Sequence, residues 1–230
     1  MARQRGKFIT FEGPDGVGKS TQMGNLAGWL RERGIDVLTT REPGGTALGE
    51  KLRSLLLSSR THDLSPRAEL ALMFADRAQH IDELILPALE RSQWVLCDRF
   101  TDSSEAYQGG GRELGSETVL QLHKILCGNL QPDLTLLMIA DLNHGLKRAQ
   151  RRNVERSRES ADDENRFEKE HHAFHQRVLE TYLAIAAREP DRVVKVDARE
   201  PIAAVRGKII SIVEERLLAD EQNRGRGLRT

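Results

Sequence analysis

The feature that most constrains this chain is a glycine-rich segment near its N-terminus. Residues 13–20 read Gly-Pro-Asp-Gly-Val-Gly-Lys-Ser, a full match to the pattern G-x-x-x-x-G-K-[ST]. The stretch Lys-Phe-Ile-Thr-Phe-Glu at 7–12, predicted as a buried strand, precedes the segment, and a predicted helix over 19–33 follows it. In this order the loop wraps phosphates with backbone N–H groups, and glycine permits the close approach and positive φ that this requires. The pattern therefore favours a phosphate-binding loop over a chance glycine-rich turn.

The chemistry of the loop makes each of its positions a candidate ligand of ATP: Gly13, Pro14, Asp15, Gly16, Val17, Gly18, Lys19, Ser20 and Thr21. Lys19 is expected to neutralise the outer phosphates during the reaction, and the Ser20 hydroxyl is expected to bind Mg²⁺. Asp98 follows a short apolar strand at 94–97 and is the expected carboxylate for the same Mg²⁺. The loop alone does not separate a kinase from a GTPase, a motor or a regulatory ATPase.

The rest of the chain alternates strands with helices. Strands are predicted at 7–12, 36–40, 94–97, 134–140 and 192–196, and helices at 19–33, 46–57, from 65 onward, 116–127, 143–151, 167–187 and 201–217. This order predicts an α/β fold of the three-layer P-loop NTPase type, with a parallel five-stranded sheet, helices on both faces and an inserted lid. We expect one kinase domain over 1–218, a lid at about 148–168 and a flexible tail over 219–230, which is polar and rich in Gly and Arg.

Charge and composition exclude several classes of partner. Lys plus Arg equals Asp plus Glu, at 35 each, so no global basic field draws the protein to nucleic acid or to a membrane surface. The most apolar run, 134–140, is too short to span a bilayer, and a cytoplasmic location is expected. Cys97 and Cys127 have no metal-ligand spacing and are expected to be reduced thiols. Histidines cluster after the lid and are expected on a solvated helix face: His171, His172 and His175.

Four segments together resemble the motifs of bacterial thymidylate kinases. They are Phe-Glu-Gly-Pro-Asp-Gly-Val-Gly-Lys-Ser-Thr at 11–21, Thr-Arg-Glu-Pro-Gly-Gly-Thr at 40–46, Asp-Arg-Phe at 98–100 and Ser-Glu-Ala-Tyr-Gln-Gly-Gly-Gly-Arg at 104–112. They occur in the order and at about the spacing of that family, and the likeness extends over 7–217. The resemblance implies transfer of the γ-phosphate of ATP to dTMP, giving ADP and dTDP. It also implies a homodimer, with the helices after the second and third strands as its surface.

The same resemblance implies residues that bind dTMP. Asp15 matches the carboxylate near the 3′-hydroxyl and phosphate of the acceptor, and Arg99 matches the arginine that holds this phosphate beside the transferred group. Further matches flank the acceptor (Arg41 and Arg53), read the pyrimidine edge (Arg77) or contact the base (Ser104 and Gln108). An aromatic residue near Arg77 stacks on thymine in many relatives. Phe74 is our choice for that role, and Met73 is the alternative.

The catalytic arginine is expected in the lid. Members of the resembled family with a small residue such as Gly16 inside the phosphate loop usually supply it from there. A guanidinium at that point neutralises the charge that spreads over the transferred phosphoryl group. The lid and its flanks offer Arg148, Arg151, Arg152, Arg156, Arg158 and Arg166. Arg152 and Arg166 are the leading candidates.

Two other functions remain open at this point. One is a kinase of another small acceptor, such as a deoxynucleoside or a different monophosphate. The other is a regulatory P-loop NTPase that acts on a protein partner. A GTPase of that class is expected to carry the N-K-x-D guanine signature, which is absent from this sequence.

Overall fold

The centre of the molecule is a parallel sheet. In the computed structural model, which describes residues 5–58, 64–140, 166–167 and 170–219, five strands run in the order β2-β3-β1-β4-β5. They are β1 (Phe8–Glu12), β2 (Val37–Arg41), β3 (Trp94–Asp98), β4 (Leu134–Ile139) and β5 (Val193–Asp197). Every pair of neighbours is parallel, as predicted. The carboxyl ends of all five strands therefore meet at one edge, where open sheets of this kind bind ligands.

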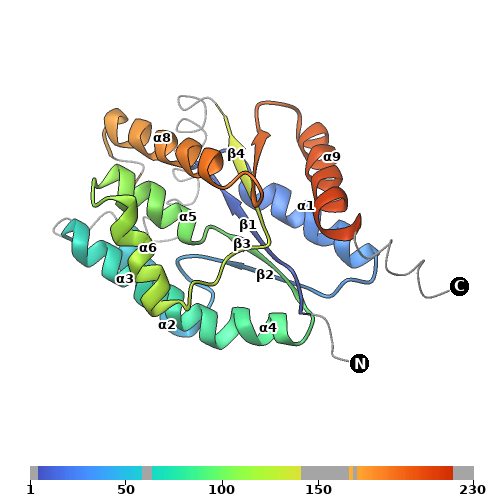
Figure 1. The fold of residues 1–230 in the computed structure, drawn as a ribbon, viewed down its shortest axis with the longest axis horizontal. Helices are drawn as coiled ribbons and strands as arrows, with labels where there is room; N and C mark the ends of the chain where they lie inside the picture. Colours follow the sequence, from blue (N-terminus) through green and yellow to red (C-terminus); the bar gives the residue numbers. More distant parts are fainter. Residues whose placement is uncertain (1–4, 59–63, 141–165, 168–169, 220–230) are drawn as a thin grey trace, which may run out of the picture.

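Helices cover both faces of the sheet (Figure 1). On one face lie α1 (Lys19–Glu32) and α9 (Ile202–Val213), which share a core with Ile9 and Phe11 of β1. On the other face lie α3 (Pro66–His80), α4 (Leu86–Glu90) and α6 (Ser116–Leu126), which pack around Phe8. Successive side chains of β1 thus enter opposite cores, as expected for a strand buried on both faces. A third cluster joins α2 (Ala47–Leu57) to α8 (His172–Arg188).

Several helix ends follow local sequence signals. The Ser65 hydroxyl accepts a hydrogen bond from the Ala68 N–H at 3.3 Å, and Pro66 occupies the first turn of α3, as the sequence predicts. Gly34, just beyond α1, has a φ of 78°, the left-handed conformation in which glycine ends helices. These local signals place the helices that carry candidate site residues.

Other elements depart from the sequence-based expectations. The segment after β3, which includes the fourth motif, forms a short helix, α5 (Thr101–Ser104), followed by a π-helix, η2 (Glu105–Gly111), although no helix was predicted there. Two further π-helical turns are η1 (Ile81–Ile85), between α3 and α4, and η3 (Glu214–Leu218), after α9. The helix predicted from 167 begins at His172. The helix predicted at 143–151 and most of the predicted lid lie outside the described residues.

The histidine prediction is wrong for one of its three residues. His171 and His172 are exposed, whereas His175 is buried on the face of α8 that holds Phe174 and Val178. The packing of α8 against the sheet buries that side of the helix. Within the described ranges there is no group of three or more His, Cys, Asp or Glu side chains arranged to hold a metal ion.

Candidate active site

The phosphate loop connects β1 to α1 at the carboxyl edge of the sheet. Gly13, Gly16 and Gly18 have φ values of 125°, 78° and 95°, which L side chains rarely adopt. A Cβ on Gly13 would lie 2.1 Å from the Met138 carbonyl oxygen of β4, so glycine is also required by space. The Lys19 ammonium donates to the carbonyl oxygens of Pro14, at 2.8 Å, and of Gly13, at 3.1 Å. The backbone of the phosphate loop therefore wraps around the Lys19 ammonium.

Ser20 and Asp98 meet beside the loop. The Ser20 hydroxyl donates to Asp98 Oδ2 at 2.7 Å, which joins the first turn of α1 to the end of β3. The other oxygen, Oδ1, is buried and has no hydrogen-bond partner among the described residues. A carboxylate oxygen left without a donor beside a serine hydroxyl fits a site for a hard cation with oxygen ligands. The two residues predicted to hold Mg²⁺ are thus brought together.

Arg99 spans the space between β3 and the phosphate loop. Its Nη2 donates to Asp15 Oδ1 at 2.6 Å and to the Tyr107 hydroxyl at 3.2 Å, and Tyr107 donates to Asp15 Oδ2 at 3.0 Å. Tyr107, on η2, belongs to the fourth motif but was not predicted as a site residue. The sequence feature that could have indicated a role for it is the Ala-Tyr-Gln-Gly segment, which follows the carboxyl end of β3. In the structure its hydroxyl holds both Asp15 and Arg99 in position.

The electrostatics of these groups follow from burial and mutual charge. Burial lowers the pKa of the Lys19 ammonium to about 8, and the positive charge of Arg99 adds to this effect. Burial alone would raise the pKa of the Asp15 carboxyl, but Arg99 and Lys19 bring that pKa well below its ordinary value. Asp15 is therefore an anion that pairs with Arg99 and is further stabilised by the charge of Lys19.

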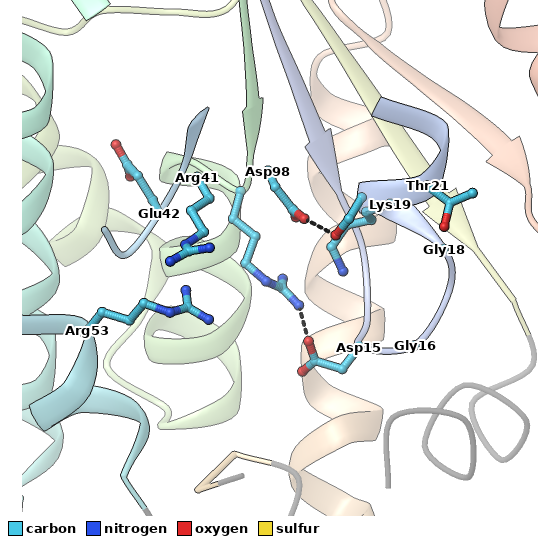
Figure 2. A pocket seen from close by; sticks show the side chains of 11 residues that line it. Asp15, Gly16, Gly18, Lys19, Thr21, Arg41, Glu42, Arg53 and Asp98 are labelled. Carbon is cyan, nitrogen blue, oxygen red and sulfur yellow. Dashed lines mark hydrogen bonds and ion pairs between the residues drawn. The ribbon is translucent and has the colours of Figure 1, made fainter. Parts of the chain in front are cut away.

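Two more arginines face the loop across a pocket of about 370 Å³ (Figure 2). Arg41 ends β2 and pairs with Glu50 at 2.9 Å, while Arg53 of α2 donates to the Pro43 carbonyl oxygen at 3.0 Å. Figure 2 shows both guanidinium groups on the side of the pocket opposite the loop, with Arg53 extended toward Asp15. Arg41, Arg53, Arg99 and Lys19 all line this pocket. A pocket with this lining suits two phosphate-bearing ligands that meet between its walls.

Arg77 and Ser104 are also brought together, behind that pocket. The Arg77 Nε donates to Glu42 at 2.8 Å, and Nη2 donates to the Ser104 hydroxyl at 2.9 Å. Nη1 is buried and lacks a hydrogen-bond partner among the described residues. An unpartnered buried N–H group is costly, which is consistent with a ligand as its missing acceptor.

Like Arg77 and Ser104, the other predicted base contacts do not line the pocket in this structure. Gln108 is buried and donates to Glu69 at 2.8 Å. Phe74 is fully buried in the core between α3, α6 and the sheet, where its ring faces His123. Met73 packs on the other side of α3, with Leu56 and Tyr107. Stacking on a base needs an exposed aromatic face, and Phe74 has none here, so the choice of Phe74 over Met73 gains no support from the geometry.

The two candidate lid arginines have different outcomes. Arg152 lies outside the described residues. Arg166 donates to the Leu56 carbonyl oxygen on α2 and to the Glu69 carboxylate on α3. It is therefore held away from the phosphate loop and does not line the pocket in this structure. The geometry gives a catalytic role for Arg166 no support.

The loop after β2 is held by three side chains that were not predicted as site residues: Glu42, Asp76 and His80. Glu42 accepts one hydrogen bond from Arg77 and faces His80 Nδ1 at 2.9 Å, while Asp76 accepts from the Gly44 N–H at 3.0 Å. Burial, and then the charge of Glu42, raises the pKa of Asp76 to about 7. The available signal was the Asp-Arg-x-x-His spacing at 76–80, which places all three side chains near one side of a helix.

Comparisons with known proteins agree on one family. Its sequence profile, described as thymidylate kinase, matches residues 11–209. A thymidylate kinase from Desulfovibrio desulfuricans is 50% identical over 221 residues, which cover 96% of this chain and 99% of that protein. Another from Teredinibacter turnerae is 48% identical over 209 residues, or 91% and 98% of the two chains.

A solved structure agrees with these sequence relatives. The crystal structure of a thymidylate kinase from Ehrlichia chaffeensis superposes with a TM-score of 0.72 at 32% identity, and the match covers 91% of this chain and 99% of that one. Across the part of the chain that the structure describes, no helix has the length and apolar character needed to cross a membrane.

Proposed function

The chain belongs to the thymidylate kinase family and is a nucleoside monophosphate kinase, and we propose that its pocket transfers the γ-phosphate of ATP to dTMP. The observation that carries this proposal is the pocket with four cations, Lys19 and Arg99 on the loop side and Arg41 and Arg53 opposite. Two phosphate groups that must approach each other repel, and cations on both sides offset that repulsion.

Each of these side chains has a place in the transfer. The phosphate loop and Lys19 bind the phosphates of ATP, and Arg99 holds the phosphate of dTMP next to the group that moves. Arg41 and Arg53 flank dTMP, and Asp15 fixes Arg99 while facing the sugar of the acceptor. The attacking phosphate oxygen is already anionic, so this reaction needs position and charge neutralisation more than a general base.

Mg²⁺ would be held by Ser20 and Asp98. The free carboxylate oxygen of Asp98 and the adjacent hydroxyl fit such an ion. When bound, the ion supplies further neutralisation of the phosphate charge. Ser20 and Asp98 also tie α1 to β3, which keeps the first turn of the helix in register with the pocket.

Recognition of the base is assigned to Arg77, with Ser104 and Glu42 orienting its guanidinium. The buried Nη1 of Arg77 is a donor suited to a carbonyl oxygen on a pyrimidine. Gln108 and either Phe74 or Met73 are proposed to complete the base site after a rearrangement that exposes them. Arg152 remains our candidate for the arginine that acts from the lid.

The state and location of the protein complete the proposal. We expect a homodimer, because exposed apolar side chains occur on the helices that follow β2 and β3, namely Leu48 and Leu55 on α2 and Ile125 and Leu126 on α6. A cytoplasmic location is expected from the sequence. A single kinase domain over 1–218 is also proposed, and the predicted tail lies, from residue 220 onward, outside the described residues.

Steady-state kinetics with a panel of monophosphates test the function. We expect ATP and dTMP to give ADP and dTDP, with dTMP preferred over dCMP, dGMP and dAMP. Arg77→Ala is expected to raise KM for dTMP while leaving KM for ATP nearly unchanged. Preference for another acceptor would support the alternative kinase, and nucleotide hydrolysis without any acceptor would support the regulatory NTPase.

A further inference from the structure

Asp98 and Arg99 are neighbours in the chain, and both act on the phosphate loop. Successive side chains of a strand point to opposite faces, yet Asp98 meets Ser20 and Arg99 meets Asp15. This is possible because Arg99 has a φ of 72°, in the left-handed region. A non-glycine residue is strained there, so its surroundings must hold the turn.

Glu12 holds the backbone of that turn. It is the last residue of β1 and is completely buried. Its Oε1 accepts the Phe100 N–H at 2.7 Å, while the Arg99 N–H donates to the Phe11 carbonyl oxygen at 3.0 Å. The backbone around Arg99 is therefore tied at two points to the end of β1, directly before the phosphate loop.

Two hydroxyls connect the same carboxylate to the guanidinium of Arg99. The other oxygen of Glu12, Oε2, accepts from the Ser103 hydroxyl at 2.6 Å and from the Tyr182 hydroxyl at 3.1 Å. Arg99 Nη1 donates to the same two hydroxyl oxygens, at 3.0 Å for Ser103 and 3.1 Å for Tyr182. The two hydroxyl oxygens also lie 2.8 Å from each other. A hydroxyl that donates its one proton to Glu12 or to its neighbour has lone pairs left to accept from Arg99. The guanidinium is thereby fixed from behind.

From these contacts we propose that Tyr182, with Glu12 and Ser103, is a positioning residue for Arg99. The inference rests on the proposed function, in which Arg99 holds the phosphate of dTMP. Tyr182 is completely buried on α8 and does not line the pocket, so it acts on the substrate only through Arg99. The contact also makes the placement of α8 against the sheet a condition for an ordered acceptor site.

The test compares Tyr182→Phe and Ser103→Ala with a matched control. Each variant removes one hydroxyl that faces Arg99, and we expect KM for dTMP to rise and kcat to fall, by about tenfold together in kcat/KM, with KM for ATP changed by less than about twofold. The control is Thr10→Val. Thr10 lies on β1 two residues before Glu12, and its buried hydroxyl bonds Thr135 at 2.8 Å without touching Arg99. Its kinetics are expected to match those of the wild type.

A double-mutant cycle separates positioning from general damage to the fold. In an Arg99→Lys background, Tyr182→Phe is expected to have little further effect on kcat/KM, because the group that it positions is gone. Equal losses in both backgrounds, or wild-type kinetics in Tyr182→Phe and Ser103→Ala, would overturn the inference. If Tyr182→Phe does not fold, Ser103→Ala carries the same cycle. A wild-type protein that does not phosphorylate dTMP would instead contradict the proposed function.

Discussion

Lys19 must be cationic to serve the phosphates, yet its side chain is buried and its pKa is lowered to about 8. Above that pH the free protein increasingly holds a neutral amine in the loop. We therefore expect the dissociation constant for ATP to rise by about tenfold for each pH unit above about 8. Calorimetric titration of ATP into the protein without dTMP, from pH 6.5 to 9.5, measures this.

Lys19→Arg provides the control, since a guanidinium does not titrate in this range. Its affinity for ATP is expected to be lower at neutral pH but flat up to pH 9.5. An ATP affinity of the wild type that stays constant to pH 9.5 would show that the loop keeps its lysine charged without a ligand.

Asp76 gives a prediction about stability rather than binding. Its pKa rises from the ordinary 3.8 to about 7 in the folded state, so between these values the folded protein binds a proton that the unfolded chain releases. This contribution to stability is present at low pH and is lost as pH rises through 7. From pH 8 to pH 5 the wild type is expected to gain roughly 2 kcal/mol over Asp76→Asn.

Urea unfolding of both proteins at several pH values provides the measurement. Other groups that titrate in this window, including His123, are common to both proteins and cancel in the difference. If the difference in unfolding free energy between the two proteins stays constant from pH 8 to pH 5, the Asp76 carboxyl is not the group that binds the proton.

The sequence could predict those residues whose role is local. Gly13, Lys19 and Ser20 lie in one short segment, and their spacing alone indicates a phosphate loop. Tyr182 could not be found in this way, because its contact with Arg99 joins positions far apart in the chain and depends on how α8 packs. Glu12 offered a signal, since it is the one charged residue in the buried strand Phe-Ile-Thr-Phe-Glu. A carboxylate at the end of a buried strand must find donors.

At the scale of secondary structure elements, η2 and α8 pack so closely that an added side-chain atom at Gly110 would clash with α8. The glycine-rich motif at 109–111 reads as a turn from its composition, but it forms part of a π-helix against α8. A Cβ on Gly110 would lie 2.0 Å from Thr181 Oγ1, a hydroxyl that donates to the Arg177 carbonyl oxygen. Sequence patterns reveal the glycines but not that they allow α8 to approach closely. This explains why the π-helix η2 was not predicted.

Gly110→Ala is accordingly expected to destabilise the fold by about 1–3 kcal/mol, the range for overpacking a close contact. Gly24→Ala is the matched control. Gly24 is an exposed residue inside α1, and a Cβ there meets no atom within 4 Å. It is expected to gain up to about 1 kcal/mol from helix propensity. Guanidinium unfolding compares the two variants, and equal stabilities would mean that α8 yields without cost.

For the whole molecule, the parallel sheet could be anticipated because strands that alternate with helices favour parallel pairing, whereas the order of the strands was not predicted. Whether two such molecules associate is harder to infer from the sequence. Single exposed apolar residues are common and carry little information. Here, among the described residues, Leu48 and Leu55 lie on α2 and Ile125 and Leu126 on α6, while Leu183 and Ile202 lie on α8 and α9. Both α2 and α6 pack on α3, and Figure 1 shows these three helices on one side of the molecule.

We therefore expect the protein to sediment as a dimer, and Ile125→Asp to shift it toward the monomer. Ile125, on α6, is 74% exposed in the single chain, and a charge buried in an apolar interface is costly. Ile202→Asp is the matched control, because Ile202 is an exposed isoleucine, 58% accessible, that begins α9 on the other face of the sheet. Sedimentation velocity over a range of concentrations distinguishes them. A monomeric wild type, or dissociation caused equally by both substitutions, would rule out α6 as the dimer surface.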